Sequence, residues 1–307
     1  MNRGRHVLIF FMDGVGLGEP DPGINPFVEA RLANLTGLLG EGWYLRDQPP
    51  RSTLRASLVP TDATLGVPGL PQSATGQATI LTGRNVPQLI GEHYGPKPNG
   101  AVAEQIAAGT LFGEVVVSGG TAGLLTPYPH RYFEAIESGR RLLSAVPLAA
   151  TSAGVPLRTV DDLRAGAAIS PDFTAQGWRD QLGYDDVPVV GLREAGARIA
   201  ALAQAHTFSF FEHWPSDRSG HRGSLQQAVE HLELIDVALG GLLDAWDDAS
   251  GLLMITSDHG NIEAKDRRQH TANPVPTILI GMGHATLAPA IHDLTDIAPV
   301  VRTFLEL

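Results

Sequence analysis

The sequence predicts an α/β protein: a doubly wound, mostly parallel sheet with helices on both faces and a small inserted cap. Three features indicate this architecture, namely short apolar runs, helix-like segments between them, and one stretch of different composition. Runs that are apolar almost throughout are typical of strands buried on both faces, as in a parallel sheet. We expect such strands at residues 7–12, 114–118, 207–211, 252–256 and 277–280.

Helical segments lie between several of these runs. Residues 224–246 carry apolar side chains close to the 3.6-residue period of an amphipathic helix, at Leu225, Val229, Leu232, Ile235, Leu239 and Leu242. Residues 194–205 are rich in alanine and follow the same tendency. The alternation of strands and helices favours a doubly wound α/β sheet.

The stretch from about residue 123 to residue 188 differs from the rest of the chain. It is rich in Pro, Gly, Thr and Ala, and its apolar pattern is weaker. We therefore expect residues 1–122 and 189–307 to form the α/β core, and about 123–188 to form a small cap or lid.

The composition excludes several classes of protein. The chain has 307 residues, of which 43% are hydrophobic and 18% charged, and these globular values argue against disorder. The formal net charge of −11 argues against nucleic-acid binding, which requires clustered Lys and Arg. Because the chain has no cysteine, disulfides, thiolate zinc sites and cysteine nucleophiles are excluded.

We expect neither a signal peptide nor a membrane span. The apolar run at residues 7–12 is shorter than a signal-peptide core, and Asp13 interrupts it. We find no stretch that approaches the roughly 20 apolar residues of a membrane span. The expectation is therefore a cytoplasmic enzyme that acts on a small molecule, and its oligomeric state stays open.

Residues of metal-ligand type follow the expected strands, where open α/β sheets bind their ligands. Asp13 follows the first strand, although an Asp-Gly turn is common when taken alone. Asp217 and His221 follow the strand at 207–211. Four residues apart, they can be aimed at one ion by a helical turn or a tight loop. A surface Asp–His contact is an equal alternative for that pair.

Two further motifs complete the pattern. Asp258 and His259 are adjacent at the end of the strand at 252–256, and a glycine follows them. His270 lies in a segment that leads into the strand at 277–280. Together the four motifs supply three Asp and three His. These side chains suit Zn²⁺ or Mn²⁺, and the residue types do not distinguish the two ions.

A candidate nucleophile lies in residues 69–83. This segment of small residues turns into a helix, which brings backbone N–H groups and the hydroxyl of Ser73 to a helix N-terminus. Anions are favoured at such a place. The structural alternative for Ser73 is an ordinary N-cap. Both roles are compatible with a helix here, so the expected helix does not distinguish them.

The order of these motifs resembles the alkaline phosphatase superfamily, in particular its branch of cofactor-independent phosphoglycerate mutases and phosphopentomutases. Residues 257–263 (Ser-Asp-His-Gly-Asn-Ile-Glu) and 270–276 (His-Thr-Ala-Asn-Pro-Val-Pro) look like phosphoglycerate mutase signatures. Residues 217–221 match the branch's Asp-x-x-Gly-His. Ser73 with a glycine three residues later fits the nucleophile segment, and Asp13 fits the first metal ligand.

The resemblance implies an alkaline phosphatase-like fold with two divalent ions, Mn²⁺ or Zn²⁺. One ion would be held by Asp13, Ser73, Asp258 and His259, and the other by Asp217, His221 and His270. Ser73, activated by coordination, would attack phosphorus and form a phosphoserine. Two ions can stabilise both the attacking and the leaving oxygen of an in-line displacement.

Two departures from the branch bear on the reaction. The mutases usually carry His where this chain has Gln77, and they hold a large inserted transferase domain for which this chain has too few residues. A hydrolase, in which water attacks the phosphoserine, needs less scaffold. We therefore expect a phosphate-ester hydrolase first. The alternative is a phosphoglycerate- or phosphosugar-type phosphomutase, followed by a phosphodiesterase or a non-catalytic metal-binding relative.

Three arginines and one amide are the candidate substrate contacts. Arg can clamp a phosphate through two hydrogen bonds. Arg84 follows the nucleophile segment, Arg131 lies in the expected cap, and Arg218 flanks a metal-ligand candidate. Asn261 follows the paired ligand candidates at 258–259. A solvated surface position is the alternative for these arginines. His213 is a weaker candidate ligand, because the second motif already supplies an Asp–His pair.

Overall fold

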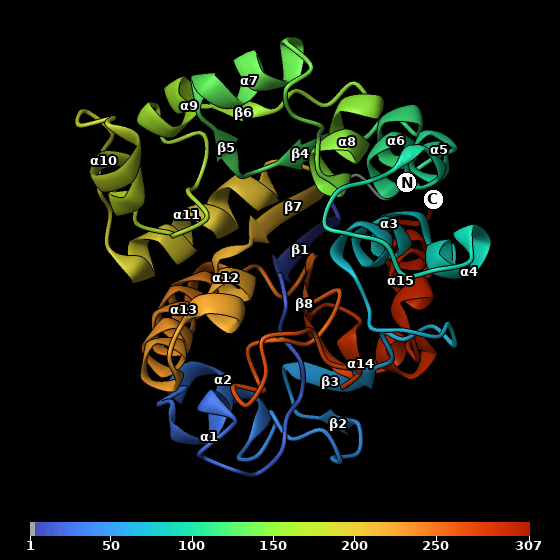
Figure 1. Cartoon of the computed structure of the whole chain (residues 1–307), viewed down its shortest axis with the longest axis vertical. Coiled ribbons are helices and arrows are strands. Elements are labelled where there is room, and N and C mark those ends of the chain that lie inside the picture. Colours follow the sequence, from blue (N-terminus) through green and yellow to red (C-terminus); the bar gives the residue numbers. More distant parts are fainter. Residues whose placement is uncertain (1–3) are drawn as a thin grey trace.

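A seven-stranded mixed sheet forms the centre of the protein in the computed structural model, which describes residues 4–307 (Figure 1). Its strand order is β2-β3-β9-β8-β1-β7-β4. Strands β3, β8, β1, β7 and β4 run in one direction, and β2 and β9 run against them. The strands are β1 (His6–Met12), β2 (Arg51–Ser52), β3 (Ala56–Thr61), β4 (Ala122–Leu124), β7 (Phe208–His213), β8 (Gly251–Thr256) and β9 (Val275–Gly281).

Helices cover both faces of this sheet. Along β1, Val7, Ile9 and Phe11 pack into one apolar cluster, and the alternate residues Leu8 and Phe10 pack into the other. The first cluster includes side chains of α3 (Ser73–Thr82), α5 (Gly100–Ala107), α6 (Leu111–Val117), α8 (Ala145–Ser152) and α15 (Ile297–Leu305). The second includes α1 (Pro26–Glu29), α2 (Ala33–Leu39), α11 (Leu192–Gln204) and α13 (Leu225–Ala245). The predicted α/β fold is confirmed.

The long helix α13 begins and packs as its sequence predicts. Ser224 caps it in a reciprocal pair with Gln227, which satisfies two otherwise free N–H groups. Its apolar stripe lies against α11. Gly196 allows this close approach, because a Cβ there would lie 1.9 Å from the carbonyl oxygen of Ala238.

The predicted strand at residues 114–118 is wrong, because these residues belong to helix α6. Valine favours strands, and the run of valines suggested one. In the structure Leu111, Phe112 and Val115 face the core at helical spacing, whereas Val117 is 89% exposed. Packing of one helical face therefore outweighs the local propensity. Strand β3 and the short strand β4 were not predicted.

Residues 123–188 contribute to two parts of the molecule. The end of β4 and the whole of α8 pack with the core. Above them lies a small layer with its own apolar cluster, which includes Val160, Leu163 and Trp178 (Figure 1). This layer contains β5 (Pro127–Tyr128), β6 (Arg158–Thr159), α7 (His130–Glu137), α9 (Val160–Arg164) and α10 (Gln176–Leu182). A cap with boundaries at about 123–188 stays a prediction.

The remaining helices are short. They are α4 (Val86–Ile90), α12 (Pro215–Arg222), α14 (His284–Leu287) and the 3-10 turns at Ala288–Ala290 and Leu294–Asp296. One segment, Gly100–Val117, is apolar and long enough by composition to cross a membrane. In this fold it consists of two short helices, α5 and α6, whose buried side chains belong to the core. That pattern is typical of core helices.

Candidate metal centre and active site

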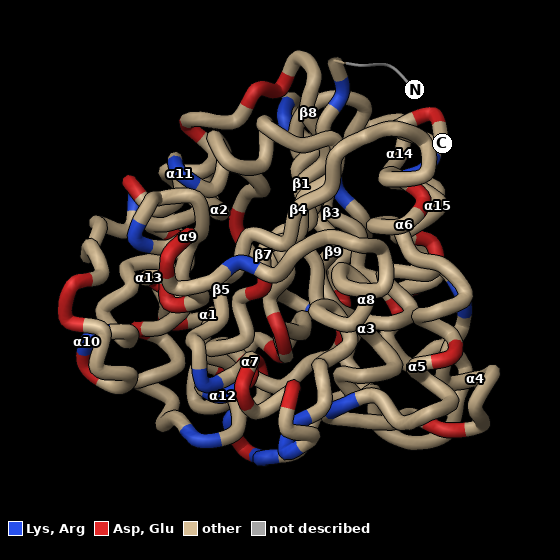
Figure 2. Tube along the Cα trace, turned by 90° about the horizontal axis from the view of Figure 1, so that it is seen from above, with Lys and Arg blue, Asp and Glu red and all other residues tan. Residues whose placement is uncertain are grey.

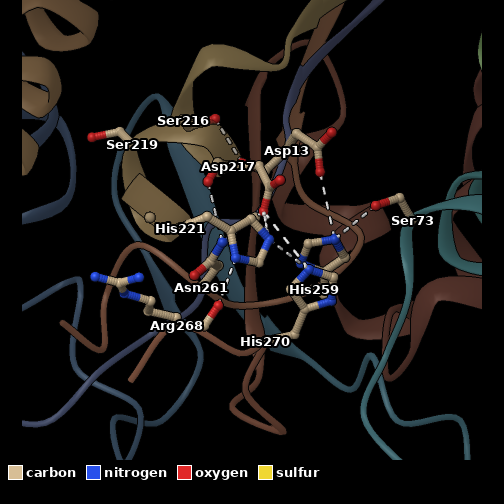
Figure 3. A network of polar contacts seen from close by, with 12 residues as sticks. Asp13, Ser73, Ser216, Asp217, Ser219, His221, His259, Asn261, Arg268 and His270 are labelled. Atoms are coloured by element: carbon tan, nitrogen blue, oxygen red, sulfur yellow. Dashed lines mark hydrogen bonds and ion pairs between the residues drawn. The ribbon is translucent and has the colours of Figure 1, made fainter. Parts of the chain in front are cut away.

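The candidate ligands meet at one edge of the sheet. Asp13 follows β1, Asp258 and His259 follow β8, and α12 follows β7 with Asp217 and His221. Figure 3 shows Asp13, Asp217, His221 and His259 pointing toward one another. His270 precedes β9, and since β9 is antiparallel to β8, its beginning lies at the same edge as the end of β8. The reversed strand explains why a residue before a strand joins residues that follow strands.

The first predicted set of ligands is gathered around His259. Its Nε2 lies 3.1 Å from the hydroxyl oxygen of Ser73, 3.5 Å from Oδ1 of Asp13 and 3.6 Å from Oδ2 of Asp258. Asp258 and His259 are fully buried, and the side chain of Asp13 is 14% exposed. Gln77 donates to Oδ2 of Asp258 at 3.2 Å, so it orients that carboxylate from helix α3.

The second predicted set is gathered around Asp217. Nε2 of His221 lies 3.3 Å from Oδ1 of Asp217, and Nε2 of His270 lies 3.8 Å from the same oxygen. The two sets adjoin, because the rings of His259 and His270 are stacked with centroids 3.6 Å apart. Ligand atoms of Asp217, His259 and His270 all lie within 4.8 Å of one another, as do those of Asp13, Asp258 and His259.

Backbone carbonyls fix which nitrogen of His221 and of His270 faces the centre. Nδ1 of His221 donates to the carbonyl oxygen of Arg268 at 2.6 Å, and Nδ1 of His270 donates to that of Pro71 at 2.8 Å. In the neutral imidazoles, both Nε2 atoms therefore carry lone pairs. These two lone pairs face each other at 3.2 Å. A cation shared between them relieves this repulsion, so the pair has the arrangement of two metal ligands.

The carboxylates of the centre also lack a counter-charge. Burial raises the pKa of Asp13 well above its usual value, and the negative charges of Asp258, Asp217 and Glu212 raise it further. Burial, followed by the charge of Asp217, raises the pKa of Asp258 to about 7. Within residues 4–307, Oδ1 of Asp13 is buried and accepts no hydrogen bond. Crowded carboxylates and an unpartnered oxygen fit a divalent cation.

Burial chiefly lowers the pKa of His259, to about 3, with a further contribution from His270. The imidazole of His259 is therefore neutral near pH 7, the form that binds a metal. Carboxylate, imidazole and hydroxyl donors fit both Mn²⁺ and Zn²⁺. The residues present thus fit a divalent metal centre, and the identity of the metal stays open.

Glu263 holds the loops of the centre together from behind. This buried carboxylate accepts hydrogen bonds from the backbone N–H of Gly16 (3.0 Å) and of Asn261 (2.8 Å). It also accepts from the hydroxyl of Thr271 (2.5 Å) and the amide of Asn273 (3.0 Å). One side chain therefore connects the loops after β1 and β8 with the segment that carries His270.

Close backbone packing places Asp13 beside Asp217. Gly14, at a φ of +67°, lies so near that a Cβ on it would be 2.6 Å from Oδ1 of Asp217. The positive φ and the proximity both require glycine at this position. The Asp-Gly sequence after β1 is therefore part of the site's geometry.

Ser73 is the first helical residue of α3, and its N-cap neighbour is Gln72. Its hydroxyl contacts His259, and no side-chain cap hydrogen bond is present at this helix start. The N-cap interpretation of Ser73 is therefore excluded. The hydroxyl lies where the dipole of a ten-residue helix favours an anion.

A cavity of about 790 Å³ opens beside the centre and is lined by Asp13, Ser73, Asp217 and Glu212. Of the predicted substrate contacts, Arg131 and Arg218 line it. Arg84 is not among the described residues that line it. Its guanidinium donates instead to the carbonyl oxygens of Gln105 and Gly109, which makes it a structural residue between α5 and α6.

Asn261 also differs from its predicted role. Its amide nitrogen donates to Oδ1 of Asp217 at 2.7 Å, so it orients a candidate metal ligand. His213, the weaker ligand candidate, lies outside the cluster: its Nδ1 donates to the carbonyl oxygen of Pro171 at 2.7 Å, and its Nε2 faces Nε2 of His231 at 2.9 Å.

The sequence analysis missed the pair Glu212 and Tyr128. Glu212 is buried near the end of β7, and the hydroxyl of Tyr128 donates to its Oε2 at 2.6 Å. Burial chiefly raises the pKa of Glu212 to about 7. An acidic residue inside an otherwise apolar strand was the available signal, but its partner Tyr128 lies in the expected cap, 84 residues away in the sequence.

The fold is alkaline phosphatase-like, and the site has the donor set of a divalent metal centre. Residues 192–307 match the family described as the Metalloenzyme superfamily, and this region includes five of the seven candidate ligands. Two solved structures share the fold. The alkaline phosphatase of the Antarctic bacterium TAB5 has a TM-score of 0.57 at 12% identity, with 98% of each chain covered. The lipoteichoic acid synthase LtaP of Listeria monocytogenes has a TM-score of 0.53 at 10% identity, covering 99% of this chain and 72% of that one.

The curated relatives carry a more particular name. A 2,3-bisphosphoglycerate-independent phosphoglycerate mutase of Rhodopseudomonas palustris is 32% identical over 133 residues, which are 40% of this chain and 26% of the mutase. The protein of the same name from Dinoroseobacter shibae is 33% identical with the same coverage. The chain therefore spans about a quarter of the length of these relatives. The resemblance predicted from the motifs is confirmed.

Proposed function

We propose that this protein is a metal-dependent phosphoryl-transfer enzyme in which Ser73 accepts the phosphoryl group of a small phosphate ester. The observation that carries the proposal is the position of the Ser73 hydroxyl. It lies at a helix N-terminus, on the wall of a cavity, and 3.1 Å from a histidine of the metal-ligand cluster. A hydroxyl group is a weak nucleophile unless a neighbouring base or metal activates it.

Two sets of residues would hold two divalent ions. The first is Asp13, Ser73, Asp258 and His259, and the second is Asp217, His221 and His270. When bound there, such ions lower the pKa of the serine hydroxyl and withdraw charge from the phosphoryl oxygens. The chain itself fixes the ligands in advance: Glu263, Gln77, Asn261 and two backbone carbonyls orient them before any substrate binds.

In the transfer step one bond to phosphorus forms as another breaks. The oxygen of Ser73 forms a bond to phosphorus while the bond from phosphorus to the ester oxygen breaks. The hydroxyl proton of Ser73 is released, and the departing alcohol oxygen takes up one proton. Glu212 lines the same cavity and, with a pKa of about 7, can hold a proton near neutral pH. Tyr128 fixes its carboxyl group.

The acceptor of the phosphoryl group in the second step distinguishes two activities. Transfer to water makes a phosphatase, and return to another hydroxyl of the substrate makes a phosphomutase. The sequence analysis placed the phosphatase first. The curated relatives carry the mutase name and favour the phosphomutase. The fold match to an alkaline phosphatase covers 98% of both chains, and it keeps hydrolysis as the second candidate.

The test follows both products at once. The metal-reconstituted protein, with Mn²⁺ or Zn²⁺, is incubated with phosphoglycerates, sugar phosphates and aryl phosphates, and phosphorus NMR detects isomers and free phosphate. Isomer formation without phosphate release identifies a mutase, and phosphate release identifies a phosphatase. The matched variants are Ser73→Ala and Ser152→Ala, since Ser152 is exposed at the end of α8. Full activity in Ser73→Ala would contradict the proposal.

A further inference from the structure

Four cationic side chains line the cavity beside the centre: Lys97, Arg131, Arg141 and Arg218. Across residues 4–307, none of these four has a carboxylate within ion-pair distance. Neighbouring arginines of the same region are paired. Arg158 lies 3.8 Å from Asp162, and Arg164 lies 2.7 Å from Asp161. The cations that face the cavity are therefore available to a bound anion. Figure 2 shows Lys and Arg on the side of the molecule where α7 and α12 lie.

Arg141 is held in place by a stacked column of aromatic rings. Its guanidinium lies 4.8 Å from the centre of the Tyr132 ring, and Tyr132 stacks on Tyr128 at 4.5 Å. Tyr128 in turn donates to Glu212. The column thus links Glu212 to Arg141, and all of its members line the cavity. A cation over an aromatic ring is stabilised without neutralising its charge.

Lys97 and Arg141 line the same cavity, and within residues 4–307 neither forms an ion pair with a carboxylate. Burial lowers the pKa of Lys97, and the positive charge of Arg141 lowers it further. A bound anion offsets the repulsion between two like charges and gains charge-assisted hydrogen bonds from both. The pair is therefore a candidate anion site on the cavity wall, and neither residue belongs to the predicted metal-ligand sets.

A large exposed ring also lines the cavity. Trp214 is 46% exposed, whereas Trp43, Trp178 and Trp246 are buried. It is the N-cap residue of α12, three positions before Asp217. An exposed indole on a cavity wall offers a flat surface for a ring of the ligand. The volume of about 790 Å³ also suits a ligand larger than a three-carbon phosphate ester.

Resting on the function proposed above, we infer that the substrate is a phosphate ester of a ring compound that carries a second anionic group. The phosphate lies at Ser73, the ring lies against Trp214, and Lys97 with Arg141 binds the second anion. That anion can be a carboxylate, a phosphate or a sulfate, since all three accept hydrogen bonds from Lys and Arg.

Binding of a matched pair of inert ligands tests this inference without turnover. Benzylphosphonate and 4-carboxybenzylphosphonate differ only in the second anion, and calorimetry in the presence of Mn²⁺ measures both affinities. We expect the carboxylated ligand to bind about fivefold more tightly, because exposed ion pairs are individually weak. The Lys97→Ala/Arg141→Ala variant should bind both ligands equally. Trp214→Ala should weaken the binding of both ligands and leave the ratio of their affinities unchanged.

Arg140→Ala is the matched control, because Arg140 is the exposed neighbour whose Nε donates to Ser138 and which does not line the cavity in the described chain. It should keep the wild-type preference. Equal affinities in the wild-type protein would overturn the inference. A preference that survives in Lys97→Ala/Arg141→Ala with unchanged thermal unfolding would overturn the assignment of the site.

Release of the aryl alcohol separates this inference from the proposed function. Phenyl phosphate and 4-carboxyphenyl phosphate each release one alcohol per transfer to Ser73, whichever acceptor follows. If both esters release their alcohol, with no difference in rate or affinity between them, the result contradicts the second-anion site. It does not contradict the proposed function. A binding preference without any release contradicts the proposed function and leaves the second-anion site standing.

Discussion

The hydroxyl oxygen of Ser73 lies 3.1 Å from Nε2 of His259. This contact joins Ser73, at the beginning of α3, to His259, which follows β8, and the two residues are 186 positions apart in the sequence. Because β1, β7 and β8 are parallel, the residues that follow them lie together at one edge. The contact therefore brings the candidate nucleophile to the ligand cluster.

Replacing Glu263 tests whether the metal-ligand cluster depends on the hydrogen bonds that Glu263 accepts. Glu263→Ala leaves two buried backbone N–H groups without an acceptor, those of Gly16 and Asn261. We expect a loss of about 3 kcal/mol in the free energy of unfolding, since each unsatisfied buried donor costs about 1–3 kcal/mol. Urea unfolding measures the loss, and Mn²⁺ titration should show weaker binding.

The control for this variant is Glu230→Ala, an exposed residue of α13 that accepts only from the side chain of Gln226. We expect a change within about 0.5 kcal/mol there. If Glu263→Ala unfolds like the control and binds Mn²⁺ normally, Glu263 does not hold the loops together.

Metal binding should strengthen as the pH rises through 7. Asp258, with a pKa raised to about 7, binds a proton below that value in the metal-free fold, and a metal ion must displace it. We expect Mn²⁺ affinity to fall about tenfold per pH unit below 7. Calorimetric titrations on both sides of pH 7 measure the slope. An affinity that does not change over that range would mean that no proton is displaced.

The same raised pKa has a consequence for stability without metal. A carboxyl group whose folded pKa lies above its unfolded value stabilises the fold at low pH, and this contribution is lost as the pH rises through about 7. Metal should therefore restore more stability above pH 7 than below it. Thermal unfolding with Mn²⁺ and with a chelator compares the two conditions.

The buried pair His213 and His231 should make stability depend on pH with a sign opposite to that expected from Asp258. Burial lowers the pKa of His231 to about 4, against an ordinary value of 6.5. The neutral fold is therefore fully stable above pH 6.5 and loses stability as the pH falls towards 4. His231→Gln should reduce the slope of the free energy of unfolding against pH by about 1.4 kcal/mol per pH unit, the value for one proton.

Unfolding in urea at several pH values between those limits measures the slope. His292→Gln is the control, because the side chain of His292 is 78% exposed. It should keep the wild-type slope. A slope that is equally steep in His231→Gln would show that other groups cause the acid sensitivity.

The sequence predicted the parts of this molecule that depend on short segments. The strands at β1, β7, β8 and β9 and the helix α13 follow from local patterns. The ligand candidates lie beside those strands, and the structure brings them together in two adjoining groups that share His259. That these sets bind metal stays a prediction, as do the boundaries of the cap and the choice of Mn²⁺ or Zn²⁺.

Features that depend on distant partners could not be predicted from the sequence. Arg84 is a predicted substrate contact, but its guanidinium donates to the carbonyl oxygens of Gln105 in α5 and of Gly109 after it, and nothing local in the sequence shows these partners. Asn261 is another predicted contact, but its amide holds Asp217. The predicted strand at residues 114–118 is wrong, because the valines there favour a strand whereas packing against the core stabilises a helix.

The most direct measurement of the central claim is the chemical state of Ser73 during turnover. Protein with Mn²⁺ is mixed with a phosphate ester that it converts, quenched in acid within the first turnover, digested and analysed by mass spectrometry. The account predicts one phosphoryl group on the peptide that carries Ser73, and none when a chelator is present or when Ser73→Ala is used. Product formed while Ser73 stays unmodified, or a phosphoryl group on another residue, would contradict it.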